Sequence, residues 1–445
     1  MPKRNTYKVG ALCAGYGGLE LGLQKIAEIK TSWVSDFESV PSRILDKRFI
    51  GPSRNPVLNY GDLTAIHNPA PVDIVTAGFP CQPVSVSGRR MGINDNRWLI
   101  EDVCRLAAES GAKWLILENV RGIFTANKGN ALRRVWDALV KNGYTRFEWG
   151  LFRASDSSAP HQRERWFCLA TATLSEHLEL TDLSPSIESQ RFSEGDYFAE
   201  SKDWVQFNGG LTDPSDVLQW LEKTPQQTLL SQVPEVPLGK WPVDGSSLGT
   251  GVLHDQTHLK EAVVKPEGFK TLPTPTAREY KDAGPNVNFP RIANRRGLTG
   301  VIMHELCRNK AFIGWEDYSV AIREWEGILG RNAPHPLENQ RFGYLSPKFV
   351  EWMMGLPENW VTGDDIDLQR SEALHALGNG VVPHQAARAI QILHSRMKNR
   401  FCSLSPQEQK LRTILDLRQN GMTWKQVGKL SGYKSSSGPR LFIKK

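Results

Sequence analysis

The stretch that decides the fold is Val72-Asp73-Ile74-Val75-Thr76-Ala77-Gly78-Phe79-Pro80-Cys81-Gln82-Pro83-Val84-Ser85-Val86-Ser87-Gly88-Arg89-Arg90. Its first half is a short apolar run rich in β-branched residues, typical of a buried strand, and Gly78, Pro80 and Pro83 then end regular structure. Cys81 is therefore expected on the loop after a strand, where open α/β sheets bind ligands and present catalytic groups. The two prolines would hold the backbone around Cys81. A small buried core residue is the alternative interpretation of a single free cysteine.

Composition indicates an ordinary globular protein of more than one domain. The chain has 445 residues, 40% of them hydrophobic and 23% charged. No apolar run approaches the length of a membrane span and no signal peptide pattern is present, so we expect an intracellular protein without membrane contact. Six cysteines are scattered without a C-x-x-C pair, which argues against disulfides and against a zinc site. Free thiols and no metal are expected.

The net charge of +7 is unevenly distributed along the chain. From Arg396 onward there are twelve Lys or Arg residues and two acidic residues, a local charge of +10, so the remainder sums to about −3. A basic segment of this kind is typical of proteins that bind nucleic acid. A solvated basic tail is the alternative.

A strand, a glycine turn and a helix open the chain. Tyr7–Leu12 is predicted as a strand, followed by the turn Cys13-Ala14-Gly15-Tyr16-Gly17-Gly18 and a helix over Leu19–Ile26. Glycines let the backbone approach a ligand, and the free N–H groups at a helix start favour its negative end. This pattern indicates a cradle for a cofactor.

Two acidic residues follow at the ends of the next segments. A second strand over 32–34 ends in Asp36-Phe37-Glu38, and an acid at this place commonly binds the ribose hydroxyls of a nucleoside cofactor. Asp62, in Gly61-Asp62-Leu63-Thr64, could bind an adenine amino group. Capping of a helix or turn is the alternative role for either acid.

Further strands would bring more polar side chains to the same edge of the sheet. Trp114-Leu115-Ile116-Leu117 predicts a buried strand that ends in Glu118, where the Cys81 loop also emerges. Arg163 and Arg165 come later at i, i+2, which places both on one side of a strand that runs on through Cys168. Buried arginines need an anionic or carbonyl partner, whereas an exposed pair needs none. Helices are expected over 98–110 and 131–139, and another strand over 147–152.

Taken together, these motifs resemble those of one enzyme family. The order G-x-G-G, acid, G-D, P-C-Q, E-N-V, R-x-R and a final G-N-x-V, here Gly378-Asn379-Gly380-Val381, is similar to that of the DNA (cytosine-5)-methyltransferases, which use S-adenosylmethionine. The resemblance covers Lys8 to about 172 and about 345 to 393. It implies an α/β fold with a Rossmann-like methyltransferase sheet, an inserted target recognition domain, and methyl transfer to a cytosine flipped out of duplex DNA.

The resemblance also implies the chemistry of each site residue. Cys81 would add as a thiolate to carbon 6 of cytosine, because carbon 5 is a poor nucleophile until the ring gains electron density. Glu118, in its protonated form, would hydrogen-bond N3 and the exocyclic amine, and burial at a strand end would raise its pKa. Arg165 would contact the base carbonyl and favour the thiolate, with Arg163 supporting it. The residues that would clamp phosphates over the flipped nucleotide are Ser85, Ser87, Arg89 and Arg90.

For the cofactor, the resemblance implies contacts from both ends of the chain. Asp36 would bind the ribose, with Glu38 as the competing choice, while Phe37 would contact the adenine ring and Asp62 its amino group. Asn379 would close the site. The remaining expected cofactor contacts are Gly15, Tyr16, Gly17, Gly18 and Pro80. The departures from the family pattern are Cys13, where the family has phenylalanine, Asp36, where it has glutamate, and His161, where its R-x-R block begins with glutamine.

The segment 173–340 falls outside the family pattern and is predicted to be the target recognition domain, between catalytic parts at 1–172 and 341–400. Its first half is acidic and rich in turn formers, whereas its second half is basic. Arginine can bind guanine bidentately in the major groove, so we expect a base-reading surface that includes Arg278, Lys281, Arg295 and Arg296. A solvated loop is the alternative.

Residues 401–445 are predicted to form a separate, basic unit like a helix-turn-helix. Ser405-Pro406-Gln407-Glu408 is a capping box with proline at the first helical position, and Asn420-Gly421 separates this helix from a second one. Contact with DNA is one interpretation of this unit. A docking or solubilising role is the other.

The hypothesis from sequence is a monomeric DNA methyltransferase of a prokaryotic or phage-type restriction-modification system. One rival is the same catalysis on RNA, and the other is a catalytically silent DNA-binding regulator of the same fold. The basic second half of the insertion and the extra tail favour duplex DNA. The presence of Cys81, Glu118 and Arg165 favours an enzyme.

Overall fold

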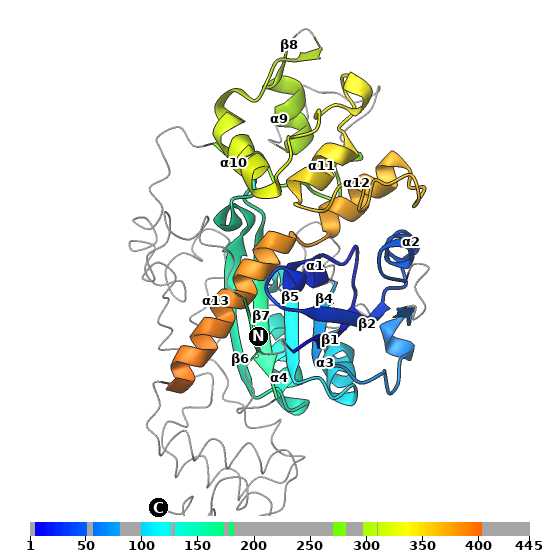
Figure 1. Cartoon of the computed structure of the whole chain (residues 1–445), viewed down its shortest axis with the longest axis vertical. Coiled ribbons are helices and arrows are strands. Elements are labelled where there is room, and N and C mark those ends of the chain that lie inside the picture. Colours follow the sequence, from blue (N-terminus) through cyan, green and yellow to red (C-terminus); the bar gives the residue numbers. More distant parts are fainter. Residues whose placement is uncertain are drawn as a thin grey trace, which may run out of the picture.

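The computed structural model describes residues 5–50, 57–80, 99–124, 126, 130–172, 178–181, 270–281, 297–308 and 310–402. In this part of the chain a seven-stranded sheet has the order β3-β2-β1-β4-β5-β7-β6 (Figure 1). Its strands are β1 (Tyr7–Leu12), β2 (Ile29–Ser35), β3 (Leu58–Asn59), β4 (Ile74–Gly78), β5 (Trp114–Val120), β6 (Arg146–Arg153) and β7 (Glu164–Thr171). The first five strands pair in parallel, and β7 runs antiparallel to both β5 and β6. The predicted Rossmann-like α/β sheet is confirmed.

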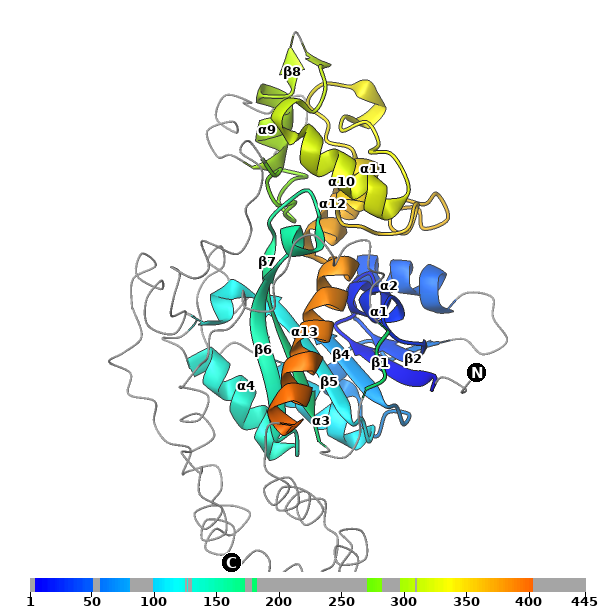
Figure 2. The same ribbon diagram turned by 60° about the vertical axis from the view of Figure 1, so that its left-hand side comes forward.

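Helices cover both faces of this sheet (Figure 2). The described helices of seven or more residues are α1 (Gly18–Gln24), α2 (Ser39–Leu45), α3 (Ile100–Glu109), α4 (Asn130–Lys141), α9 (Leu298–His304), α10 (Ser319–Leu329), α11 (Pro347–Met353), α12 (Arg370–Asn379) and α13 (Pro383–Cys402). One face packs against α3 and α4. The other face packs against α1 and α13, so the two ends of the catalytic region share one layer.

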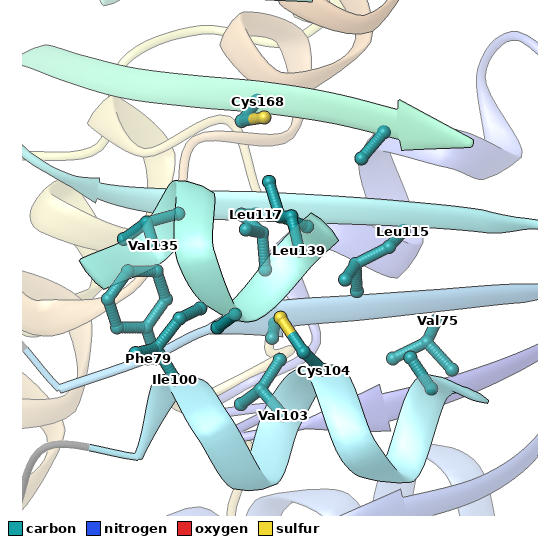
Figure 3. Close-up of a cluster of buried hydrophobic side chains, with 14 of the residues drawn as sticks. Val75, Phe79, Ile100, Val103, Cys104, Leu115, Leu117, Val135, Leu139 and Cys168 are labelled. Carbon is teal, nitrogen blue, oxygen red and sulfur yellow. The ribbon is translucent and has the colours of Figure 1, made fainter. Parts of the chain in front are cut away.

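The central strands β4 and β5 are apolar along most of their length because both of their faces are buried. Ile74 and Ile116 belong to the core that α1 and α13 complete. Val75 and Leu115, one residue along each strand, belong to the core on the α3 and α4 side (Figure 3). This alternation explains why the sequence shows continuous apolar runs here rather than a polar and apolar period of two.

Four cysteines of the described residues are free thiols, as predicted: Cys13, Cys104, Cys168 and Cys307. Cys104 on α3 and Cys168 on β7 lie among the aliphatic side chains of the core in Figure 3. Burial raises the pKa of both thiols, so they remain protonated and act as small core residues.

A second hydrophobic core joins α9, α10, α11 and α12 in a separate lobe (Figures 1 and 2). The Trp325 indole Nε1 donates to the Trp352 carbonyl at 2.9 Å, so α10 and α11 are bonded as well as packed. The helix start predicted at Ser346 is confirmed, because its hydroxyl accepts from the Phe349 amide at 3.4 Å. Thus α11 packs with α9 and α10. The sequence had predicted α11 in the closing catalytic part, 341–400, and α9 and α10 in the target recognition domain, 173–340. The domain boundaries themselves stay predictions.

The C-terminal part of the described chain contains the closing helix that the sequence predicts. The closing helix expected over 386–397 is present as the longer α13, and the tail unit from Ser403 onward lies outside the described residues. Every described helix is too short or too polar to cross a membrane. Among the same residues, no three His, Cys, Asp or Glu side chains are grouped as a metal site would require.

Candidate active site

The strand ends that carry the predicted site residues meet at one edge of the sheet. β4 and β5 are in register at Gly78 and Glu118. A Cβ placed on Gly78 would lie 3.5 Å from Glu118 Oε2 and 3.8 Å from the carbonyl oxygen of Cys13, which follows β1. The turn after β1, the entry to the Cys81 loop and Glu118 are therefore neighbours. The parallel arrangement of β1, β4 and β5 makes this the carboxyl edge of all three strands.

The glycine turn after β1 has the backbone geometry that its composition predicts. Gly15 and Gly17 have φ values of +57° and +82°, which residues other than glycine rarely adopt. The Gly17 amide donates to the Ala14 carbonyl at 2.8 Å, closing the turn. A Cβ placed on Gly15 would meet nothing within 4 Å, so the turn leaves open space beside Gly15.

Asp36 is bonded directly to this turn. One carboxylate oxygen accepts from the Gly15 amide at 2.9 Å and the other from the Glu38 amide at 3.1 Å. Burial nevertheless raises the pKa of Asp36 to about 6, because these two amide bonds only partly offset the loss of water. The neighbouring Phe37 ring is 69% exposed, so its face is accessible to a ligand.

Asp62 takes the alternative role that the sequence left open. Its carboxylate caps a short 3₁₀ turn by accepting from the Thr64 amide at 2.9 Å and the Thr64 hydroxyl at 2.8 Å. The residue before it, Gly61, accepts from the Ser35 hydroxyl at 2.7 Å, which holds Asp62 beside the end of β2. Contact with adenine stays a prediction.

Glu118 and Arg165 form an ion pair at the end of β5. Arg165 Nε lies 3.2 Å from Glu118 Oε1, and the two strands are paired at Val120 and Arg165. Burial raises the pKa of Glu118, while Arg165 and then Arg163 oppose the shift. The raised pKa that the sequence predicted for this carboxyl is therefore confirmed in direction.

Cys81 and the phosphate-clamp residues Ser85, Ser87, Arg89 and Arg90 lie outside the described residues, as do Arg295 and Arg296. Pro80 is the last described residue before Cys81 and is half-buried. The sequence analysis missed Asn119, whose buried side-chain amide donates to the Phe79 carbonyl at 3.2 Å. This bond ties the first residue of the Cys81 loop to the residue after Glu118.

Arg163 lies one residue before β7 and has a φ of +26°, so strand alternation does not extend to it. Its buried guanidinium donates to the carbonyls of Pro275 at 3.2 Å and Gly378 at 3.1 Å, and to that of Gly380. Arg163 thus has the carbonyl partners that a buried arginine requires. These contacts make it a positioning residue for the segment that carries the exposed Asn379. A part in catalysis stays a prediction.

His161, which stands where the family has glutamine, is also fully buried. Its Nε2 lies 3.1 Å from the Met353 carbonyl, so it joins the sheet lobe to the end of α11. Burial, followed by the charge of Arg163, lowers the pKa of His161 to about 3. The ring is therefore neutral and donates this bond from Nε2.

The two described members of the predicted base-reading surface, Arg278 and Lys281, are exposed on a turn at 277–281. The buried carboxylate of Glu279 fixes this turn by accepting from the Thr299 amide at 3.1 Å. A Cβ placed on Gly378 would lie only 2.1 Å from the Ala277 amide nitrogen, so the turn packs directly against the chain that leads to Asn379.

Comparisons with known proteins agree with the motifs. A family model described as C-5 cytosine-specific DNA methylase matches residues 7–393. Type II methyltransferase M.Eco47II of Escherichia coli is 32% identical over 243 residues, which is 53% of this chain and 54% of that protein. Type II methyltransferase M.BsuFI of Bacillus subtilis is 34% identical over 157 residues, 35% of this chain and 36% of that protein.

The chain spans about half or less of the length of these curated relatives. Among solved structures, the methyltransferase EhMeth of Entamoeba histolytica is 15% identical with a TM-score of 0.46, covering 88% of this chain and 99% of that one. The fold assignment depends on the sheet itself and not on this likeness. Because the family match includes every strand of the sheet and extends into α13, the chain belongs to the C-5 cytosine-specific DNA methylase family.

Proposed function

We propose that this protein transfers a methyl group from S-adenosylmethionine to carbon 5 of a cytosine flipped out of a specific duplex DNA sequence. The observation that carries the proposal is the buried Glu118 carboxylate, paired with the half-buried Arg165 near the end of β5 and beside the entry to the Cys81 loop. A buried carboxyl with a raised pKa next to a guanidinium can bind a neutral ring that carries both a donor and an acceptor. The N3 and amino edge of cytosine has this pattern.

The residues around the glycine turn fit S-adenosylmethionine. Gly15 leaves open space beside the turn, Asp36 offers carboxylate oxygens for ribose hydroxyls, and the exposed Phe37 ring offers a face for adenine stacking. Asn379, exposed at the end of α12, would contact the methionine end of the cofactor together with Gly17 and Gly18. When bound, the cofactor supplies a methyl group activated by its sulfonium.

Covalent addition of Cys81 would create the nucleophile. The Cys81 thiolate forms a bond to carbon 6, and the electron pair of the 5,6 double bond moves into the ring, which makes carbon 5 reactive. After methylation at carbon 5, a base removes the proton there and the thiolate leaves, restoring the double bond. Asn119 would hold the start of this loop in place through the Phe79 carbonyl.

Glu118 would stabilise the electron-rich ring that forms only after addition. In its protonated form the carboxyl donates to N3 while its other oxygen accepts from the amino group. Arg165, whose Nε lies 3.2 Å from Glu118 Oε1, would contact the base carbonyl and lower the pKa of the Cys81 thiol. The counteracting effects of burial and Arg165 on Glu118 would let it gain and lose a proton during turnover.

The helical lobe and the 277–281 turn would face the DNA. Arg278 and Lys281 lie on this exposed turn, and Arg295 and Arg296 would extend the base-reading surface. Ser85, Ser87, Arg89 and Arg90 would hold backbone phosphates. The relatives named above are Type II methyltransferases, which supports a restriction-modification role for this protein. It would act as a monomer inside a prokaryotic or phage-type host cell.

Methyl transfer from a donor with a labelled methyl group tests the proposal. We expect label in duplex DNA, at carbon 5 of cytosine, and none in RNA of matched sequence. Label in RNA alone would replace the DNA assignment. Absence of transfer to either nucleic acid, while DNA is still bound, would favour the catalytically silent regulator.

Cofactor affinity should rise as the pH rises through about 6 and stay level above it. Burial gives Asp36 a pKa of about 6 in the free protein, and ribose hydroxyls donate to its ionised form, so protonation below that pH competes with binding. Calorimetric titration with S-adenosylhomocysteine from about pH 5 to about pH 8 measures this dependence. Asp36→Asn should weaken binding about tenfold at neutral pH and remove the dependence. If Glu38→Gln removes it and Asp36→Asn does not, Glu38 is the ribose ligand.

A further inference from the structure

Tyr16, in the middle of the glycine turn, is held by parts of the chain far away in sequence. Its side chain is 1% exposed, and its hydroxyl donates to the Val381 carbonyl at 2.8 Å across 365 residues. Burial raises the pKa of the phenol, so the hydroxyl remains a donor at any working pH. The side chain therefore does not point into the space beside Gly15, where the cofactor would bind.

The segment that receives this hydroxyl is shaped around the Tyr16 ring. A Cβ placed on Gly380 would lie 1.8 Å from the ring, and one on Gly18 would lie 2.3 Å from the Val381 carbonyl oxygen. Arg163 holds the same segment from the other side through the Gly378 and Gly380 carbonyls. The chain around Asn379 thus has two fixed supports, Tyr16 and Arg163.

The backbone of Tyr16 also has a hydrogen-bond partner far away in sequence. The Trp360 indole Nε1 donates to the Tyr16 carbonyl at 2.8 Å. Trp360 belongs to the connection between α11 and α12, which Arg48 also binds through the Trp360 carbonyl at 2.7 Å and a bidentate ion pair with Asp365. Tyr16 is therefore bonded to two segments of the chain, one on each side of α12.

We propose that Tyr16 is a positioning residue that transmits occupancy of the cofactor site to the 378–382 segment, and through Trp360 to the 357–367 connection of the helical lobe. The inference depends on the proposed function, since it requires that the glycine turn binds S-adenosylmethionine. Its physical basis is that one residue contributes to two sites. The Tyr16 backbone lines the turn, while its side-chain hydroxyl and its main-chain carbonyl hold the two segments. Cofactor binding orders the turn and, through these two bonds, orders its partners.

Hydrogen exchange with S-adenosylhomocysteine as the probe tests the transmission directly. In the unmodified protein the probe should slow amide exchange in the turn at 13–18 and also at 378–382 and 357–367. In Tyr16→Phe the ring still fills the space beside Gly380 but the hydroxyl is gone. We expect protection of 13–18 to persist, protection of 378–382 to be lost, and affinity for the probe to fall about tenfold.

Tyr144→Phe is the matched control, because the Tyr144 hydroxyl is also buried and also donates to a distant carbonyl, that of Ala112, at 2.8 Å. It should lower thermal stability as much as Tyr16→Phe while leaving probe affinity within about twofold. Trp360→Phe, which removes the indole donor to Tyr16 and shortens the ring that packs against Phe49 and Arg48, should abolish protection of 357–367 and retain that of 378–382.

The outcomes separate this inference from the function on which it rests. If the unmodified protein does not bind the probe, the proposed function fails and the inference fails with it. If the probe binds but protection is confined to 13–18, or is the same in Tyr16→Phe as in the unmodified protein, the inference alone is overturned. Equal losses of affinity in Tyr16→Phe and Tyr144→Phe would also overturn it, because general destabilisation would then explain the effect.

Discussion

Replacing Cys81 by serine should lower methyl transfer by a factor on the order of 10⁴ while leaving affinity for S-adenosylhomocysteine unchanged within about twofold. A serine hydroxyl is not ionised at neutral pH and is a far weaker nucleophile than a thiolate, so carbon 6 would not be attacked. Single-turnover transfer of a labelled methyl group measures the loss. Calorimetric titration measures the binding.

A control variant and a trapped covalent adduct make this test specific to Cys81. Cys307→Ser makes the same chemical change at a buried thiol in the helical lobe and should retain full activity. Duplex DNA that contains a fluorinated cytosine blocks the final proton removal, so a covalent adduct should accumulate on the peptide that spans Phe79 to Gln82. Undiminished turnover of Cys81→Ser, or an adduct on another peptide, would remove Cys81 from its role.

Replacing Arg163 by methionine should lower the free energy of unfolding by about 3 kcal/mol. Methionine keeps much of the apolar volume, but the carbonyls of Pro275, Gly378 and Gly380 lose their buried donor. Urea denaturation measures this loss, provided that the dependence of the free energy of unfolding on urea concentration has the same slope in both proteins. Affinity for S-adenosylhomocysteine should also fall, because Asn379 is carried by the released segment.

Arg153→Met is the matched comparison for this variant. Both arginines neighbour the 3₁₀ turn at 154–157, since Arg153 precedes it and the Arg163 carbonyl accepts from the Ala154 amide at 3.3 Å. The Arg153 side chain, however, is 57% exposed and pairs with Glu164 at 3.3 Å. Its loss should change stability by no more than about 0.5 kcal/mol. A change below about 1 kcal/mol for Arg163→Met would show that water or a neighbouring donor replaces the guanidinium, and the positioning role would have to be abandoned.

The parts of the fold that could be predicted from the sequence are those encoded by residues close together in the chain. The strand expected over Tyr7–Leu12 has those bounds in the structure, and the helix start at Ser346 carries its expected cap. Both follow from the period of apolar residues and from capping chemistry, which a few neighbouring residues encode. Glu118 was placed at a strand end for the same reason, and burial followed from the apolar run before it.

The contacts that the sequence did not predict join side chains to backbone carbonyls far away from them in sequence. Every main-chain unit has a carbonyl, so nothing in the sequence marks Val381 as the partner of Tyr16 or Gly380 as a partner of Arg163. Trp360 is one of 14 tryptophans, and no spacing distinguishes it from those that only fill the core. Glycine at 378 and 380 was read as part of a family motif, whereas the structure shows the close packing that excludes any side chain there.

The position of α13 has a consequence for how the protein is made. Val9, Ile74 and Ile116 on the first strands share a core with Ile390 and Leu393, which are added to the growing chain hundreds of residues later. Until the ribosome has synthesised and released that helix, one side of the nascent sheet exposes aliphatic side chains to water. The time between translation of β1 and of α13 is therefore the period in which this protein most needs protection from aggregation.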